Sequence, residues 1–168
     1  MTGTPRATTV DRPTSGPKHC LTVDEEPFGS DDAVRLRTVA RLERAQLGAE
    51  RVAIDPQDAP ARIASHLIVR DRSGAPIGCA ALVAVDDGVF EIHRFYVRFD
   101  SRGLGAGKVL LEALEQRAIA LGGGATVIET TPSLPDTVSF LTRSGYRQIA
   151  LWGPYVGRPT SICFSKVL

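Results

Sequence analysis

The pattern of apolar and polar positions predicts ten elements in the order strand, helix, three strands, helix, strand, helix and two strands. The helices have apolar residues three and four positions apart, whereas the strands are short apolar runs bounded by Gly, Pro and Asp. The predicted strands cover residues 19–23, 65–70, 77–85, 89–97, 125–130, 146–152 and 160–167, and the predicted helices cover residues 31–47, 109–121 and 134–143. This order indicates a mixed α/β sheet with helices on its faces.

The two longer helices have recognisable ends and an expected buried face. Asp31 is the predicted N-cap of the first helix, and Gly48 closes it. Its expected apolar face consists of Val34, Val39, Leu42 and Leu47 with neighbouring alanines. The second helix ends at residues 122–124, and its expected apolar stripe consists of Leu110, Leu111, Leu114, Ala118 and Leu121. Turn signals at residues 71–74 and 86–88 join three of the strands into an antiparallel meander.

The composition describes one globular domain. With 168 residues, 43% of them hydrophobic, the chain is long enough to bury a core. Residues 1–17 have little to bury and predict a disordered tail, which leaves residues 18–168 as the domain. The net charge of +1, with arginines interleaved with acids, argues against nucleic-acid binding. The chain contains no run of eighteen apolar residues, so the sequence predicts no membrane-spanning helix.

The three cysteines predict neither a disulfide nor a metal site. Cys20, Cys79 and Cys163 are far apart, and none has the spacing to Cys or His that zinc requires. Cys79 and Cys163 lie within apolar strands, where a free cysteine packs as a small hydrophobe. Together with the absence of a secretory signal pattern, this favours a cytoplasmic location.

The most informative segment is residues 95–108, where a strand is followed by a loop with three glycines and then by a helix. The glycines alternate with other residues, at Gly103, Gly105 and Gly107. They allow backbone N–H groups to turn outward together, and the start of a helix adds unpaired donors and positive dipole. Arg102 and Lys108 add positive charge at the two ends of the loop.

Two known phosphate-binding motifs do not fit this loop. A mononucleotide P-loop requires Gly-Lys-Ser/Thr, but Val109 follows Lys108, and the motif's first glycine falls on Arg102. A dinucleotide GxGxxG motif requires glycine at Lys108 or at Leu110, depending on its register. Three glycines alone are more often a structural turn. The flanking strand and helix nevertheless favour a cradle for a pyrophosphate group.

The segment resembles the GNAT N-acetyltransferase superfamily. Arg102, Gly105 and Gly107 meet its Q/R-x-x-G-x-G/A loop, and Phe95-Tyr96-Val97 meets the aromatic-x-Val end of the strand before it. Three later segments add to the resemblance: residues 127–131, which are similar to the family's "LE-T" strand, residues 140–146, which meet its next helix in part, and residues 153–155 with 161–168, which resemble a bacterial branch.

This resemblance implies a mostly antiparallel sheet flanked by helices and acetyl-CoA as the cofactor. It implies that backbone groups of Phe95 and Val97 pair with the pantetheine arm, and that amides of residues 103–108 hold the pyrophosphate. The implied cofactor-binding residues are Phe95, Tyr96, Val97, Arg102, Gly103, Leu104, Gly105, Ala106, Gly107, Lys108, Phe140, Leu141 and Arg143. Core packing explains Phe95, Tyr96 and Phe140 equally well, and Arg143 also fits a solvated helix position.

Acetylation of an amine requires a base, because the ammonium must lose a proton before it attacks. Glu91 and His93 are two positions apart on the strand before the loop, so their side chains share one face. The resemblance implies a water-linked carboxylate at Glu91, and a histidine suits proton transfer near neutral pH. Alternatively, Glu91 pairs with an arginine and His93 is a satisfied sheet histidine. The backbone N–H of Val97 is the expected donor to the thioester carbonyl.

The chain departs from the family at the acid for the leaving thiolate. Leu141 stands where the family usually has tyrosine, and Leu134 stands where an asparagine is common. Tyr146 is expected to pack against the following strand. The candidate residues for binding the acceptor are Arg94, Glu129, Trp152 and Tyr155, of which Glu129 also fits a surface ion pair and Trp152 also fits a core position.

Several functions therefore stay open. The first is an acetyl-CoA-dependent N-acetyltransferase that acts by direct attack on an amine of a small molecule or peptide. The second is a non-catalytic acyl-CoA-binding sensor, for which Leu141 and Leu134 argue. The third is an acyltransferase that uses a longer acyl group. Homodimers are common among similar proteins, so a homodimer is compatible with the resemblance.

Overall fold

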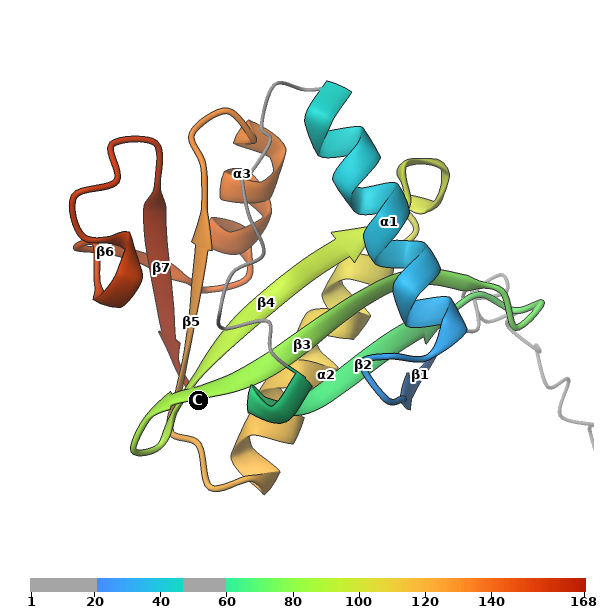
Figure 1. Cartoon of the computed structure of the whole chain (residues 1–168), viewed down its shortest axis with the longest axis horizontal. Coiled ribbons are helices and arrows are strands. Elements are labelled where there is room, and N and C mark those ends of the chain that lie inside the picture. Colours follow the sequence, from blue (N-terminus) through green and yellow to red (C-terminus); the bar gives the residue numbers. More distant parts are fainter. Residues whose placement is uncertain (1–20, 47–59) are drawn as a thin grey trace, which may run out of the picture.

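A computed structural model describes residues 21–46 and 60–168 of the chain. Seven strands form one sheet in the order β1-β2-β3-β4-β5-β7-β6, in which only β4 and β5 run parallel (Figure 1). The strands are β1 Thr22–Glu25, β2 Ile63–Arg70, β3 Pro76–Asp86, β4 Val89–Val97, β5 Ala125–Thr130, β6 Arg147–Ile149 and β7 Ile162–Val167. The helices are α1 Asp31–Gln46, α2 Ala106–Ala120 and α3 Pro135–Arg143, with short 3-10 helices η2 Pro60–Arg62, η3 Phe99–Ser101 and η4 Gly153–Tyr155.

The predicted mixed sheet and element order are confirmed, with differences at the edge strands. The first strand begins at Thr22, and β6 keeps only residues 147–149 of the predicted 146–152. The predicted tail at residues 1–17, Cys20, Leu47 and Gly48 lie outside the described residues. No helix within the described ranges is long and apolar enough to cross a membrane.

Helix α2 packs on the face of the sheet that forms the larger core. Leu110, Leu111, Leu114 and Ala118 are buried as predicted, and they pack with apolar residues of β2, β3 and β4. The prediction that Leu121 lies in the core is wrong, because this residue follows the last helical residue and is 39% exposed. One helix face and the alternate residues of three strands therefore form a continuous core.

Helix α1 lies on the opposite face of the sheet, in front of β3 and β4 in Figure 1. Of its predicted apolar positions, the neighbouring alanines Ala33 and Ala40 are buried, whereas Val34, Val39 and Leu42 are each more than 40% exposed. The buried residues of α1 are Ala33, Leu36 and Ala40, which pack against Ile68, Cys79 and Tyr96. The predicted N-cap is shifted by one residue, since Ser30 Oγ accepts a hydrogen bond from the Ala33 amide.

A bulge in β4 opens the sheet beside β5. The register with β3 shifts between Cys79/Tyr96 and Ala81/His93, so that β4 contains one extra residue there. Arg94 lies in this segment with φ +55°. The parallel pairing with β5 covers only Val89–Glu91 of β4, and Figure 1 shows the two strands separating beyond it. The backbone of β4 beyond the bulge is thus not paired to β5.

Candidate active site

The point at which β4 leaves β5 contains three buried polar side chains. Glu91 and His93, both on β4, share the α1 face of the sheet, as predicted from their spacing. Glu91 is 1% exposed and His93 is 5% exposed. Tyr155 of η4, also 1% exposed, donates a hydrogen bond of 2.5 Å to Glu91 Oε1. His93 Nε2 lies 2.8 Å from the other carboxylate oxygen, Oε2.

In this arrangement one oxygen of the carboxylate accepts a hydrogen bond, and the other lies close to an imidazole nitrogen. Tyr155 is 64 residues from Glu91 in the chain, and the loop between β6 and β7 brings it to the strand. A buried carboxylate is stable only when partners compensate for its lost hydration. The phenol holds Glu91 in one orientation and leaves Oε2 directed at His93. Glu91 and His93 can therefore share a proton without contact with bulk water.

Aromatic residues border the trio. The Trp152 and Tyr155 rings lie edge to face, with centroids 5.8 Å apart. The Arg158 guanidinium carbon lies 5.6 Å from the centre of the Tyr155 ring. The indole N–H of Trp152 is buried and has no hydrogen-bond partner among the described residues. A buried donor of this kind is costly, which is typical of a position that a ligand completes.

Glu129 lies on the same face as Glu91, one strand away. Val127 of β5 pairs with Glu91, and Glu129 is two positions further along β5. Its carboxylate accepts a hydrogen bond of 2.6 Å from Ser161 Oγ. The structure therefore brings together Glu91, His93 and Tyr155 and places Glu129 nearby, at the widening gap between β4 and β5.

The glycine loop has the geometry of an anion cradle. Gly103 and Gly105 have φ of +79° and +87°, and no heavy atom lies within 4 Å of a Cβ built on either. Gly105 is the N-cap of α2. In the described part of the chain, no backbone carbonyl accepts a hydrogen bond from the N–H groups of residues 103–108. These donors lie at the start of α2, at the positive end of its helix dipole.

The residues of this loop fit the pyrophosphate of acetyl-CoA. A negatively charged group binds where several free N–H groups converge and no side chain obstructs the approach. Lys108 adds a cation on the first turn of α2, where its ammonium lies 3.8 Å from Glu112 and is mostly exposed. Leu104 is also exposed, and Ala106 is buried beneath the loop.

Two predicted cofactor residues form an aromatic wall beside the cradle. The Phe95 and Phe140 rings stack with centroids 5.7 Å apart. A Cβ on Gly107 is within 4 Å of both rings, so this glycine brings the first turn of α2 close to the pair. Phe95, Phe140 and Gly107 therefore come together from β4, α3 and α2.

Other predicted cofactor residues lie elsewhere. Arg102 donates hydrogen bonds to the Val97 carbonyl (2.9 Å) and to Glu43 Oε2 (2.7 Å), so it is tied to β4 and α1. Tyr96 lies on the α1 face, where its hydroxyl donates to Glu43 Oε1 at 2.6 Å. Burial first, and Glu43 second, raise the pKa of Tyr96. Glu43 joins both residues to α1, and no sequence signal indicated it.

On α3, Leu141 is 1% exposed and belongs to the larger core, whereas Arg143 is exposed in the last turn. Tyr146 contacts the preceding strand β5, where its hydroxyl lies 2.8 Å from Thr126 Oγ1, and the following strand β7, where the Lys166 ammonium lies 5.6 Å from its ring centre; burial raises its pKa. Leu141 has no proton to donate, and the Tyr146 hydroxyl is engaged with Thr126. Arg94, predicted to bind the acceptor, lies within the bulge.

Comparisons with known proteins identify the class. Residues 36–146 match the family model described as Acetyltransferase (GNAT) family, which covers well over half of the chain. The chain therefore belongs to the GNAT acetyltransferase family. It is an enzyme, an acetyltransferase that uses acetyl-CoA.

Two relatives are similar in sequence. An IAA acetyltransferase of Azospirillum brasilense is 31% identical over 104 residues, which are 61% of this chain and 68% of the relative. An uncharacterized N-acetyltransferase of Schizosaccharomyces pombe is 32% identical over 94 residues, which are 55% of this chain and 56% of that protein.

Solved structures share the fold. A Klebsiella pneumoniae protein described as an acyl-CoA N-acyltransferase is 26% identical, with a TM-score of 0.74 over 89% of this chain and 98% of that chain. A GNAT acetyltransferase of Elizabethkingia anophelis, solved with acetyl-CoA bound, is 17% identical, with a TM-score of 0.67 over 88% of this chain and 98% of that chain. Below 25% identity, the second likeness concerns the fold alone.

Proposed function

We propose that this acetyltransferase acetylates a primary amine of a small molecule or peptide, by direct attack while acetyl-CoA and the amine are both bound. The main support for this function is the buried group of Glu91, His93 and Tyr155 at the point where β4 separates from β5. One face of this opening has the free amides of the glycine loop, and the other has a carboxylate–histidine pair. The relative in Azospirillum brasilense is named an IAA acetyltransferase, and the one in Schizosaccharomyces pombe an N-acetyltransferase.

The pair of Glu91 and His93 removes the proton from the incoming ammonium. An alkylammonium has an ordinary pKa of about 10.4, so it arrives protonated and cannot attack. Tyr155 fixes the carboxylate of Glu91, and the carboxylate in turn orients His93. Because both groups are almost fully buried, the pair holds this proton until it passes to the departing thiolate, which leaves as the amide bond forms and the thioester bond breaks.

The remaining groups position the donor. Acetyl-CoA, when bound, supplies an acetyl group whose carbonyl gains negative charge during attack. We assign the backbone N–H of Val97 to polarise that carbonyl, because β4 has left its partner β5 at this point. The amides of residues 103–108 hold the pyrophosphate, and Phe95 and Phe140 line the path between. With Leu141 buried in the core, no side chain of α3 takes the tyrosine's usual role as acid.

Replacing the carboxylate tests the base. Glu91→Gln keeps the shape but removes the acceptor for the proton, so we expect kcat to fall about 10²–10⁴-fold. The dissociation constant for acetyl-CoA, measured by isothermal titration, should stay unchanged because Glu91 does not contact the glycine loop. Asp87→Asn, at the exposed turn between β3 and β4, is the matched carboxylate-to-amide control. An unchanged kcat in Glu91→Gln removes Glu91 as base.

Tyr155→Phe tests positioning separately from proton removal. The variant loses only the hydrogen bond to Glu91, so we expect about a 10–100-fold lower kcat. In the Glu91→Gln background the same substitution should lower kcat little further, because the carboxylate that Tyr155 orients is already absent. A packing role alone lowers kcat equally in both backgrounds, and that result contradicts the assignment.

A cytoplasmic location is also part of this proposal. Cys79 and Cys163 form no disulfide among the described residues and are fully buried, and burial raises the pKa of the Cys79 thiol to about 12. Buried cysteines that form no disulfide are typical of proteins in reducing compartments.

A further inference from the structure

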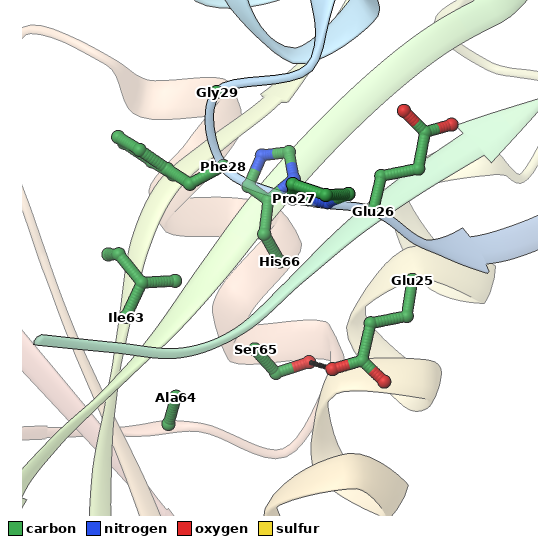
Figure 2. A pocket seen from close by; sticks show the side chains of 9 residues that line it. All are labelled: Glu25, Glu26, Pro27, Phe28, Gly29, Ile63, Ala64, Ser65 and His66. Atoms are coloured by element: carbon green, nitrogen blue, oxygen red, sulfur yellow. Dashed lines mark hydrogen bonds between the residues drawn. The ribbon is translucent and has the colours of Figure 1, made fainter. Parts of the chain in front are cut away.

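A hollow lies at the edge of the sheet, between the start of β2 and the connection from β1 to α1. Its volume is about 430 Å³, and it is lined by Glu25, Glu26, Pro27, Phe28, Gly29, Ile63, Ala64, Ser65 and His66. Figure 2 shows the His66 ring directed from β2 toward Pro27 and Phe28. The size suits part of a small organic molecule, and the walls are largely apolar.

His66 is a buried polar group beside this hollow. The residue is 2% exposed, and neither ring nitrogen forms a hydrogen bond of good geometry among the described residues, although the Glu26 backbone acts on the ring and favours its charged form. Its ring meets Phe28 edge to face, with centroids 5.4 Å apart. Burial first, and the nearby Arg37 second, lower the pKa of His66 to about 4. At neutral pH the ring is uncharged, so it offers one hydrogen-bond donor and one acceptor.

The acidic residues at the rim do not provide a site for a cation. Glu25 accepts hydrogen bonds from Ser65 Oγ at 2.8 Å and from Arg117 at 3.1 Å, the first of which is visible in Figure 2. Glu26 is bound by Arg70. Both carboxylates are thus held by arginines of the chain itself, and Arg70 is shared with Asp24 and Asp32.

Arg37 of α1 adds positive charge beside the hollow. Its guanidinium carbon lies 3.7 Å from the centre of the Phe28 ring. Its Nη1 is buried without a hydrogen-bond partner in the described ranges, and desolvation lowers its pKa. A cation placed against Phe28 is therefore repelled, whereas an uncharged group is not.

The strand register connects this hollow to the proposed catalytic pair. His66 pairs with Ala81, and Ala81 pairs with His93, so the three side chains project from the same face of adjacent strands. Ala81 has only a methyl group between the two histidines. Two strand spacings are roughly 10 Å, a distance that a small molecule spans.

We propose that this hollow is the acceptor subsite, and that the acceptor is a primary amine joined to an uncharged apolar group with one hydrogen-bonding atom that pairs with His66. The proposal rests on the proposed function, since the amine is placed at Glu91 and His93. The apolar body fills the space beside Phe28 and Ile63. Diamines and polyamines, which carry a second cation, are excluded from this class.

A panel of four amines tests the class through acetyl-CoA-dependent thiol release. The amines are tyramine, 2-phenylethylamine, 1,5-diaminopentane and ethylamine, which differ in the hydroxyl, the apolar body and the second charge. We expect kcat/KM to be highest for tyramine, about 3–10-fold above 2-phenylethylamine, as one hydrogen bond provides. Ethylamine, which does not reach the hollow, and 1,5-diaminopentane should be at least about tenfold poorer than 2-phenylethylamine.

Gly29→Leu fills the hollow without straining the backbone. No heavy atom lies within 4 Å of a Cβ at Gly29, and its φ is not positive. We expect the variant to lose tyramine's advantage over ethylamine and to keep its ethylamine rate and its acetyl-CoA affinity. Gly124→Leu is the matched control, because a Cβ at Gly124 also has no heavy atom within 4 Å and this residue immediately precedes β5.

His66→Phe tests the hydrogen bond by itself. The variant keeps the ring shape and should abolish only the difference in kcat/KM between tyramine and 2-phenylethylamine.

The two proposals fail separately. If Gly29→Leu changes no amine's kcat/KM while ethylamine is acetylated, the subsite is wrong and the proposed function stands. If no amine is acetylated, isothermal titration of tyramine into the protein saturated with CoA decides the subsite. Tyramine binding that Gly29→Leu removes supports it, and no binding overturns it. A preference for 1,5-diaminopentane over tyramine also overturns it.

Discussion

At the scale of single residues, the glycines of this chain differ in what they do. Gly105 has φ +87° at the N-cap of α2, a conformation that an L-residue adopts at a cost of about 1–2 kcal/mol. Gly124 has equally open surroundings but no positive φ. Conformation at Gly105, more than lack of space, therefore requires glycine in the cradle.

This difference predicts the outcome of paired alanine substitutions. Gly105→Ala should lower the free energy of unfolding by about 1–2 kcal/mol and weaken acetyl-CoA binding, because the loop amides turn away from their common direction. Gly124→Ala should change stability by less than about 1 kcal/mol. Urea denaturation and isothermal titration measure the two effects. Equal stability losses at both positions contradict the conformational explanation.

At the scale of elements, α1 shows how a helix packs by its small residues. Ala33, Leu36 and Ala40 lie against the sheet, so that α1 approaches β3 and β4 closely. Close approach also brings Glu43 to Tyr96 and Arg102, which links α1 to the strand and loop of the cofactor site. The larger apolar residues of α1 are left on its outer side.

Two leucines of α1 should therefore respond differently to truncation. Leu36→Ala removes a side chain that is 3% exposed and should lower the free energy of unfolding by about 2–5 kcal/mol. Leu42→Ala, at 55% exposed, should change it by about 0.5 kcal/mol or less. Thermal or urea unfolding of both variants checks this. A large loss at Leu42 would mean that its outer face is covered in solution.

At the scale of the whole molecule, burial of an uncharged histidine makes stability depend on pH. His66 has an ordinary pKa of about 6.5 when unfolded and a pKa of about 4 when folded. As the pH falls from about 6.5 to about 4, the unfolded chain takes up a proton that the folded chain does not. The contribution of His66 to stability falls by about 3 kcal/mol over this range and changes no further below it.

The contribution of His66 is measured by difference. Urea unfolding from pH 7 to pH 4 on the native chain includes every carboxylate, whereas the difference from His66→Phe isolates the histidine. Glu26 and Arg37 both act on this group, and burial is the largest cause. We expect the variant to lose about 3 kcal/mol less than the native chain across the range. If the free energies of unfolding of the two proteins change with pH in parallel, His66 is not a neutral buried histidine.

Much of the fold and part of the site follow from local features of the chain. Alternation of apolar residues and turn signals predict the meander of β2, β3 and β4, and the spacing of Glu91 and His93 predicts their shared face. The glycine loop is predicted because a strand, a loop with glycines and a helix follow one another directly. These features depend on neighbours a few positions apart, so the sequence alone determines them.

The remaining features depend on pairing and packing between distant segments. Tyr155 reaches Glu91 because the loop between β6 and β7 folds over the sheet, and His66 aligns with His93 because a strand register places Ala81 between them. Helix α1 buries its small residues because closeness to the sheet, and not side-chain size, decides which face is covered. The sequence thus determined the elements and the cradle. Tertiary structure decided which side chains share the site, since contact depends on register and interlayer distance.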